Sequence, residues 1–367
     1  MNWGLTCATA LAALSIDGSA FAMGDAGSPY RDARQKTQGP ADVIVADGRA
    51  PASLLVFPEF ENTDGCVTLL TVTNVAASGD DVDVEFVYID GDDCSEFNRV
   101  ETLTPNDTVT LLTEYHNPQD EDGYVYAFAR EGSTPIVWNN LIGNVMIIDG
   151  LETFEYSTNP LTFLGIGSES GEVQADGTPT DLDGDGNRDL DGKEYAQCPD
   201  EILVPRFLGQ DDGGAHRGLG VESELLLIAL SGGSQFTTTV DFLIYNDNEE
   251  VFSSEYSFDC WDDPDLLDIS GIFSNNFLNQ ATNHDSGEVA GTDNVETGWF
   301  RVDGAVASST VETIHDPAVF CVLVEEVSSD YAVADLPFSI GAQDNGSLLP
   351  HGVLGDGDPS PENGDDQ

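Results

Sequence analysis

The chain has 367 residues, of which 68 are acidic and 11 are basic, so its formal net charge is −57 at pH 7. Because binding to phosphate groups requires a basic patch, this balance excludes nucleic acid as a partner. The hydrophobic fraction of 40% is that of a folded protein; one core rarely exceeds about 250–300 residues, so the length predicts two domains.

The N-terminus has the pattern of a secretory signal peptide over residues 1–22. An apolar run covers residues 5–14, and a small-x-small cleavage pattern precedes Met23. One departure is that no Lys or Arg comes before the apolar run. We expect residues 23–41 to be a flexible lead-in. Nowhere else does an apolar run approach the ~18 residues of a membrane helix, so no membrane span is expected.

The next segment, residues 42–166, has the pattern of an antiparallel β-domain. Short runs rich in Val, Ile, Thr, Phe and Tyr alternate with polar residues, and clusters such as ASGDD and NPQDEDG separate them. This spacing is typical of an antiparallel sandwich or barrel. The expected strands are 54–60, 66–74, 82–90, 108–115, 123–129 and 143–149.

Residues 167–197 have few large apolar side chains and read as an acidic linker. Within it the chain reads DLDGDGNRDLDGKEY (181–195). Asp181, Asp183 and Asp185 alternate along this run and a glycine follows, so the chain could wrap and point carboxylates inward. Calcium prefers six to eight such hard oxygen ligands.

The same run departs from a true EF-hand loop, which carries Glu at its twelfth position. Here Gly192 stands at that position, Glu194 comes two residues later, and no helix pattern flanks the run. Asn187 could add its carbonyl oxygen, Asp189 could bind through a water molecule, and Glu194 is the remaining candidate ligand. The run resembles the D-x-D-x-D-G-x-x-D loops of thrombospondin type 3 and dockerin-like calcium repeats over about 15 residues. The resemblance implies structural Ca²⁺; the alternative is a solvated acidic hinge.

The strand pattern then recurs in the same order over residues 198–341. EILVPRF is similar to LLVFPEF, TTVDFLIYN is similar to DVEFVYID, and GWFRVDG is similar to GYVYAFA. The recurrent strands are 201–207, 224–231, 238–246 and 298–304, and residues 263–278 are the best helix candidate. We therefore predict an all-β protein of two tandem antiparallel β-sandwich domains, Ig-like or jelly-roll-like, that arose by internal duplication. The Gly-, Pro- and Asp-rich residues 342–367 are predicted to be a disordered tail.

The cysteines that follow the signal pattern are odd in number, which leaves one thiol over. Export makes disulfides plausible. Cys66–Cys94 would join early strands of the first domain, and Cys260 could pair with Cys321 or with Cys198. The chain contains no C-x-x-C, so a zinc or redox centre is not expected.

The charge indicates a saline habitat, because a surface this negative repels itself until salt screens it, and the screening length falls to about 3 Å at 1 M. The alternative is an acidic secreted protein that gains only solubility. With the signal pattern, the chain is expected to be secreted, to the periplasm, the cell surface or the medium.

No catalytic motif is recognisable. The GSESG at 167–171 has Glu169 where the nucleophile elbow requires Ser, and none of the histidines forms a metal-binding pair. The aromatic residues Tyr124, Tyr126, Trp138, Trp261 and Trp299 could form a sugar-stacking platform, although a core role is favoured. We expect a non-enzymatic structural or binding protein; the alternative is a polysaccharide-active hydrolase or a pair of carbohydrate-binding modules.

Overall fold

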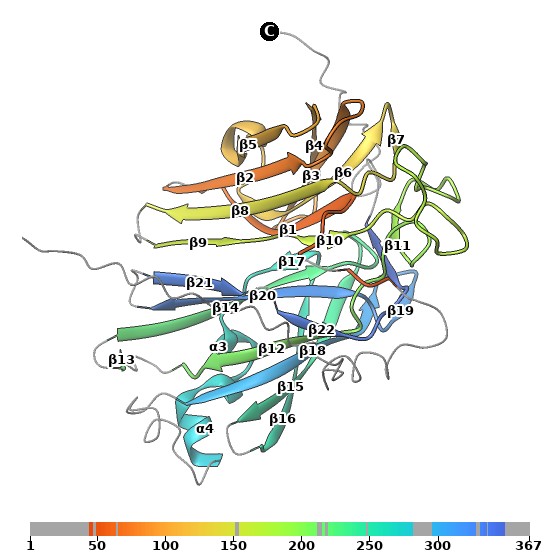
Figure 1. The fold of residues 1–367 in the computed structure, drawn as a ribbon. Coiled ribbons are helices and arrows are strands. Elements are labelled where there is room, and N and C mark those ends of the chain that lie inside the picture. Colours follow the sequence, from red (N-terminus) through yellow and green to blue (C-terminus); the bar gives the residue numbers. More distant parts are fainter. Residues whose placement is uncertain are drawn as a thin grey trace, which may run out of the picture. The chain divides into compact units, whose positions relative to one another are not determined.

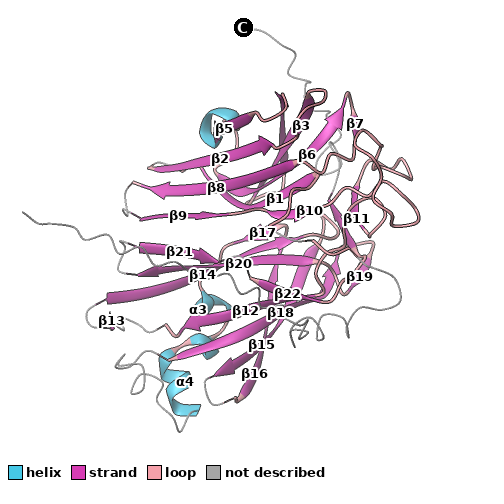
Figure 2. Ribbon diagram, viewed as in Figure 1, coloured by secondary structure: helices cyan, strands magenta, loops and turns pink. Residues whose placement is uncertain are grey.

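The computed structural model describes residues 44–348 except 47–48, 64, 151–153, 211–214, 217–218, 247–248, 282–295, 328–330 and 336. The expected signal peptide, all of the lead-in, and residues 349–367 lie outside the described residues. Strands make up nearly all of the described regular structure, and they pair in antiparallel sheets (Figures 1 and 2). The all-β class predicted from the strand pattern is therefore confirmed. None of the described helices is long and apolar enough to span a bilayer.

Two sheets form the first half of the described chain. The first has the order β10-β1-β6-β3-β4, with β7 attached to β6, and the second has the order β5-β2-β8-β9. The elements are β1 (Leu54–Glu61), β2 (Cys66–Asn74), β3 (Val82–Asp90), β4 (Glu96–Leu103), β5 (Thr108–Leu112), α2 (Thr113–His116), β6 (Asp122–Glu131), β7 (Thr134–Pro135), β8 (Leu141–Asp149), β9 (Phe154–Thr158) and β10 (Leu161–Phe163).

The second half again contains two large sheets. Their orders are β16-β15-β18-β12-β22, with β19 attached to β18, and β13-β14-β20-β21, with β17 attached to β14. The strands are β12 (Glu201–Leu208), β13 (Ala215–His216), β14 (Leu219–Ala229), β15 (Thr237–Asn246), β16 (Val251–Phe258), β17 (Trp261–Asp262), β18 (Thr297–Ser308), β19 (Thr313–His315), β20 (Val319–Val327), β21 (Tyr331–Asp335) and β22 (Phe338–Ile340). The predicted helix at 263–278 is three short helices: α3 (Leu266–Ile269), η1 (Gly271–Phe273) and α4 (Asn275–Ala281).

Strand order and one irregularity are the same in both halves. In the first sheet of each half, the order β10-β1-β6-β3-β4 corresponds to β22-β12-β18-β15-β16. The register of β1 on β6 shifts between Phe57 and Phe60, and that of β12 on β18 shifts between Val204 and Phe207. Beyond each shift a glycine takes the paired position, Gly123 opposite Phe60 and Gly298 opposite Phe207.

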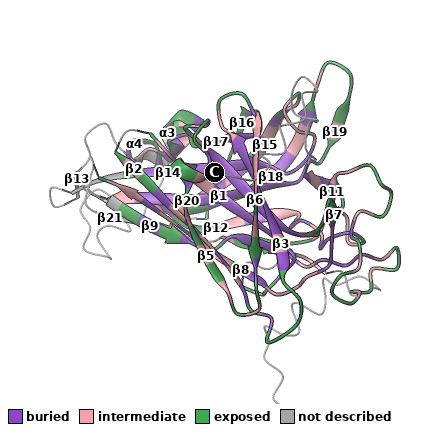
Figure 3. Ribbon diagram, turned by 90° about the horizontal axis from the view of Figure 1, so that it is seen from above, coloured by how far each residue is buried: buried purple, intermediate pink, exposed green. Residues whose placement is uncertain are grey.

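Buried aromatic side chains contribute to the core of both halves. Figure 3 shows that the buried positions lie along the central strands, such as β1, β6 and β18. In the second half, Phe207, Phe300 and Phe273 pack edge to face or tilted, with ring centroids 5.1–5.8 Å apart. In the first half, Phe60 lies edge-on to Tyr88 at 5.3 Å. Apart from Phe273 of η1, these side chains belong to strands, where the apolar–polar alternation predicted them.

The segment 167–197, predicted as an acidic linker with a calcium-type loop, is partly built into the core. Leu190 and Tyr195 are completely buried, and the strand β11 (Arg188–Leu190) pairs with β23 (Gly346–Leu348). The predicted disordered tail therefore begins too early, because β23 lies within it. A glycine is required at 346, since a Cβ there would lie 2.7 Å from the Cys198 sulfur. The described residues from Ile44 to Leu348 belong to one compact unit.

The described disulfide joins the two halves, and it corrects the predicted pairing. Cys94, in the turn between β3 and β4, is bonded to Cys260, just before β17. Cys66, Cys198 and Cys321 are free thiols. Cys66 begins β2, which belongs to the sheet opposite β3, so closeness in sequence to Cys94 was misleading. Beside the bond, the indole nitrogen of Trp261 donates a hydrogen bond to the carbonyl oxygen of Pro58 at 2.9 Å.

Candidate metal centre

The aspartate run forms a tight loop that its own side chains hold in shape. The carboxylate of Asp181 accepts a hydrogen bond from the Gly184 amide at 2.8 Å, that of Asp183 from the Asp185 amide at 3.1 Å, and that of Asp185 from the Asn187 amide at 2.8 Å. Gly184 and Gly186 have φ of +75° and +87°, a backbone region that side chains disfavour. The alternation of Asp with Gly therefore serves the turns as well as the placement of carboxylates.

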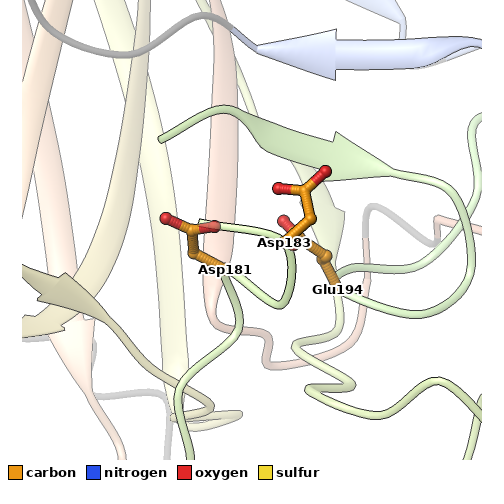
Figure 4. Close-up of side chains that lie close together, drawn as sticks. All are labelled: Asp181, Asp183 and Glu194. Atoms are coloured by element: carbon orange, nitrogen blue, oxygen red, sulfur yellow. The ribbon is translucent and has the colours of Figure 1, made fainter. Parts of the chain in front are cut away.

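Two overlapping groups of carboxylates converge in this loop. The first comprises Asp181, Asp183 and Glu194, and the second comprises Asp183, Asp185 and Asp189. Within each group the nearest carboxylate oxygens all lie within 4.8 Å of one another, and Figure 4 shows the first group. Oxygens at 2.3–2.6 Å from one Ca²⁺ ion would be separated by no more than about 5 Å. Asp183 belongs to both groups and is therefore central.

Glu194 reaches the loop although it follows the expected EF-hand position by two residues. It is only 3% exposed. Its two carboxylate oxygens accept hydrogen bonds from the amides of Leu182 (2.5 Å) and Asp189 (3.3 Å). Burial raises the pKa of Glu194 to about 7, and the nearby charges of Asp189 and Asp181 add to this. A cation at this position would offset the cost of a buried negative charge.

The other two candidate ligands, Asp189 and Asn187, differ in their surroundings. The pKa of Asp189 is raised to about 6 by burial first and then by the charges of Asp185, Asp191, Asp183 and Asp181. The carbonyl oxygen of Asn187, a predicted ligand, accepts a hydrogen bond from the Arg188 guanidinium at 2.7 Å. That guanidinium would compete with a cation for the carbonyl, so the carboxylates are the better ligands.

Two residues that sequence reasoning did not single out anchor the loop. Arg188 is buried, lies over the ring of Phe128 at 4.5 Å, and donates hydrogen bonds to the carbonyls of Gly186 and Asn187. The Tyr195 hydroxyl accepts a hydrogen bond from Thr180 at 2.9 Å. An arginine and an aromatic residue inside an acidic stretch were the available signals. The Arg188 contact ties the loop to Phe128 of β6, and the Tyr195 hydrogen bond joins two parts of the segment 167–197.

A second feature is an open groove of about 490 Å³ on the outer face of the β16-β15-β18-β12-β22 sheet. Its lining includes Asp241, Glu255, Arg301 and Asp303. Burial raises the pKa of Asp303 to about 6, with smaller contributions from Asp316, Glu201, Asp200 and Asp241. The groove thus has several carboxylates and one guanidinium beside apolar residues such as Leu243.

An aromatic pair lies beside this groove. Tyr245 and Trp299 are paired across β15 and β18, next to the Leu243–Arg301 pair, and their rings stack at 4.2 Å. Trp299 is 36% exposed. The other aromatic residues considered for a sugar platform are Tyr124, Tyr126 and Trp261, which are buried, and Trp138, which is half-buried. They form no common exposed platform.

Comparison with known proteins adds no function. No family model matches the chain, and no curated protein matches it. The crystal structure of Thermotoga maritima 1070 aligns with 30% of this chain and 94% of that chain, at 12% identity and a TM-score of 0.25. That degree of likeness supports no conclusion about fold or function.

Proposed function

We propose that the chain is a secreted, non-enzymatic structural or binding protein of the cell surface, periplasm or extracellular matrix of a saline-adapted bacterium, with an acidic loop that binds structural Ca²⁺. The observation that carries the proposal is the convergence of Asp181, Asp183, Asp185, Asp189 and Glu194 in two groups sharing Asp183. The disulfide is compatible with an oxidising compartment, and the charge of −57 suits high salt.

The benefit of the ion would be mechanical. Without it, clustered carboxylates repel one another. With it, the loop would be held rigid next to β11, which pairs with β23. Glu194 already contacts this strand, because its carboxylate accepts a hydrogen bond from the amide of Asp189. Calcium would thus stiffen the region where β23 pairs with β11, in the segment between the two halves.

We further propose that the two halves are duplicated β-sandwiches. Two features support this. The strand orders match, and beyond the register shift of β1 and of β12 the paired residue on the neighbouring strand is a glycine, Gly123 or Gly298. Independent β-domains would have no physical reason to share both features.

Calcium is expected to raise the stability of the protein. At a concentration about 100 times the dissociation constant, a ligand of the native state adds about 2.7 kcal/mol. We would measure thermal unfolding at about 1 M NaCl, with about 10 mM CaCl₂ and then with EDTA. Asp183→Ala should abolish the shift because Asp183 belongs to both carboxylate groups.

The control is Asp81→Ala, which removes the same charge from an exposed position away from the loop and should keep the calcium shift. Superimposed traces with calcium and with EDTA would mean that the run is a solvated hinge. A shift that survives Asp183→Ala would place the ion elsewhere.

The groove favours a second candidate, polysaccharide binding. Carboxylates and a guanidinium can hydrogen-bond to sugar hydroxyls, and an aromatic side chain can pack on a sugar ring. If so, Trp299→Ala should weaken binding to a polysaccharide panel by about tenfold or more, which is about 1.4 kcal/mol. Affinity electrophoresis would measure it. Phe338→Ala, which alters an exposed residue of β22 outside the groove lining, should bind as the wild type; absence of binding to every polysaccharide would exclude this candidate.

A further inference from the structure

The outer face of the β5-β2-β8-β9 sheet differs chemically from the rest of this acidic protein. Figure 1 shows these four strands side by side. Alternation along the strands and the exposure pattern place one set of side chains outward. We call this set the threonine face: Val67, Leu69, Thr71, Thr73, Thr108, Thr110, Leu112, Ile142, Asn144, Met146, Ile148, Glu155 and Ser157.

Charge is nearly absent from the threonine face. Glu155, on the strand β9, is its one ionisable side chain, in a chain with 68 acidic residues. The corresponding strand of the second half, β14, instead exposes Glu222 and Glu224. The neutral surface is therefore a property of the first half and not of the strand arrangement.

Apolar groups are exposed on this face, and its hydroxyls are already paired. Val67, Leu112 and Ile142 are 38%, 41% and 40% exposed. Thr71 bonds to Thr110 at 3.0 Å, and Thr73 to Thr108 at 2.9 Å, across β2 and β5. Burying a hydroxyl costs little when it keeps a hydrogen-bond partner. Covering the threonine face would thus bury apolar area at a low desolvation cost.

We propose that the threonine face is the contact surface of a weak, salt-dependent two-fold dimer of this chain. Two copies that each carry a charge of −57 repel wherever their acidic surfaces meet, and this face is where approach adds almost no like-charge contact. A basic partner would be drawn to the acidic remainder of the surface instead. If the threonine face bound the groove of a second copy, Asp241, Asp303 and Glu255 would be buried without partners, which is costly. The threonine face therefore binds the threonine face of the second copy.

The size of the face sets the strength of the contact. The outward-facing residues span about 20 Å on β2 and β8, about 14 Å on β5 and about 7 Å on β9, and with strands about 4.8 Å apart they give a footprint of about 300 Å² per copy. A standard interface covers about 800 Å² per partner. The dimer is therefore weak and concentration-dependent. It strengthens with salt, because the screening length falls from about 10 Å at 0.1 M to about 3 Å at 1 M.

Sedimentation of the purified protein over a concentration series, at about 0.1 M and about 2 M NaCl, tests the proposal. We expect the average mass to rise toward that of a dimer with concentration at high salt, and to stay monomeric at low salt. Thr110→Asp and, separately, Ile142→Asp should remain monomeric in both. Each adds one carboxylate per copy to the contact surface, where it would be buried without a partner; circular dichroism identifies a variant that has failed to fold.

The matched control is Val311→Asp, which adds the same charge at a position 86% exposed and outside the threonine face. It should associate as the wild type does. The proposal is overturned by a monomer under all conditions, by association that survives both face substitutions, or by mass that grows beyond a dimer, which would require two different faces. A monomer that adsorbs instead to lipid vesicles or polysaccharide through this face also contradicts it.

Discussion

Replacing Cys94 and Cys260 together by serine is expected to lower the free energy of unfolding by about 2–5 kcal/mol, the usual range for a native disulfide. The effect should lie toward the upper end, because the bond closes a loop between residues 166 apart in sequence. Closing a longer loop removes more conformational entropy from the unfolded chain. Trp261 packs beside the bond and donates a hydrogen bond to Pro58, so loss of the link also loosens a junction between the halves.

Urea unfolding in high salt would measure this change, with Cys66→Ser as the control. Cys66 is a half-buried free thiol, so its substitution should change stability by less than about 1 kcal/mol. Peptide mapping without reduction should also recover Cys94 and Cys260 in one linked product. Equal stability of the double serine variant and the wild type would show that the link does not constrain the folded protein.

Gly123→Ala is expected to destabilise the protein by about 3–5 kcal/mol, through overpacking and an unfavourable backbone conformation. At this position φ is +133°, and a Cβ would lie 2.0 Å from the carbonyl oxygen of Ile89. Its counterpart Gly298 is equally confined, since a Cβ would lie 2.4 Å from the Tyr245 carbonyl oxygen and 2.6 Å from the Phe207 ring. Each glycine is paired with the first residue beyond a register shift, Phe60 of β1 or Phe207 of β12.

The contrast is Gly132→Ala in the turn after β6, where φ is +61° but no atom lies within 4 Å of the added Cβ. It should cost only about 1–2 kcal/mol, from the backbone alone. The three variants would be compared by denaturant unfolding. A mild effect of Gly123→Ala or Gly298→Ala, close to that of Gly132→Ala, would mean that the bulges are not conserved packing devices of the two halves.

Local patterns predicted much of the β-structure. The expected strands 66–74 and 82–90 coincide with β2 and β3, and 201–207 and 238–246 agree with β12 and β15 within one residue. The edge strands β4 and β16 were missed, and so was β20, which lies between β14 and β21. In β16, VFSSEYSF alternates between exposed and half-exposed positions with few large apolar groups, so it lacks the signal that burial imposes on a central strand. That reason does not apply to β20, whose VFCVLVEEV is apolar and largely buried.

Part of the candidate site was predictable for the same reason. The phased aspartates at 181, 183 and 185 are local in sequence, and the structure brings them together with Asp189. Glu194 was also a predicted ligand, and it joins Asp181 and Asp183. The anchoring by Arg188 on Phe128 and the pairing of β11 with β23 were not predictable. These contacts depend on where the loop folds back and on strands far away in the chain.

The amino-acid order alone thus determined the acidic surface, the all-β class, and the recurrence of one strand series. The tertiary structure decided that Cys94 bonds to Cys260, that the segment 167–197 enters the core, and that one sheet face remains almost free of charge. The physical reason is range: alternation and turn chemistry act over a few residues. Which cysteines bond and where the segment 167–197 pairs is set by packing between segments more than a hundred residues apart.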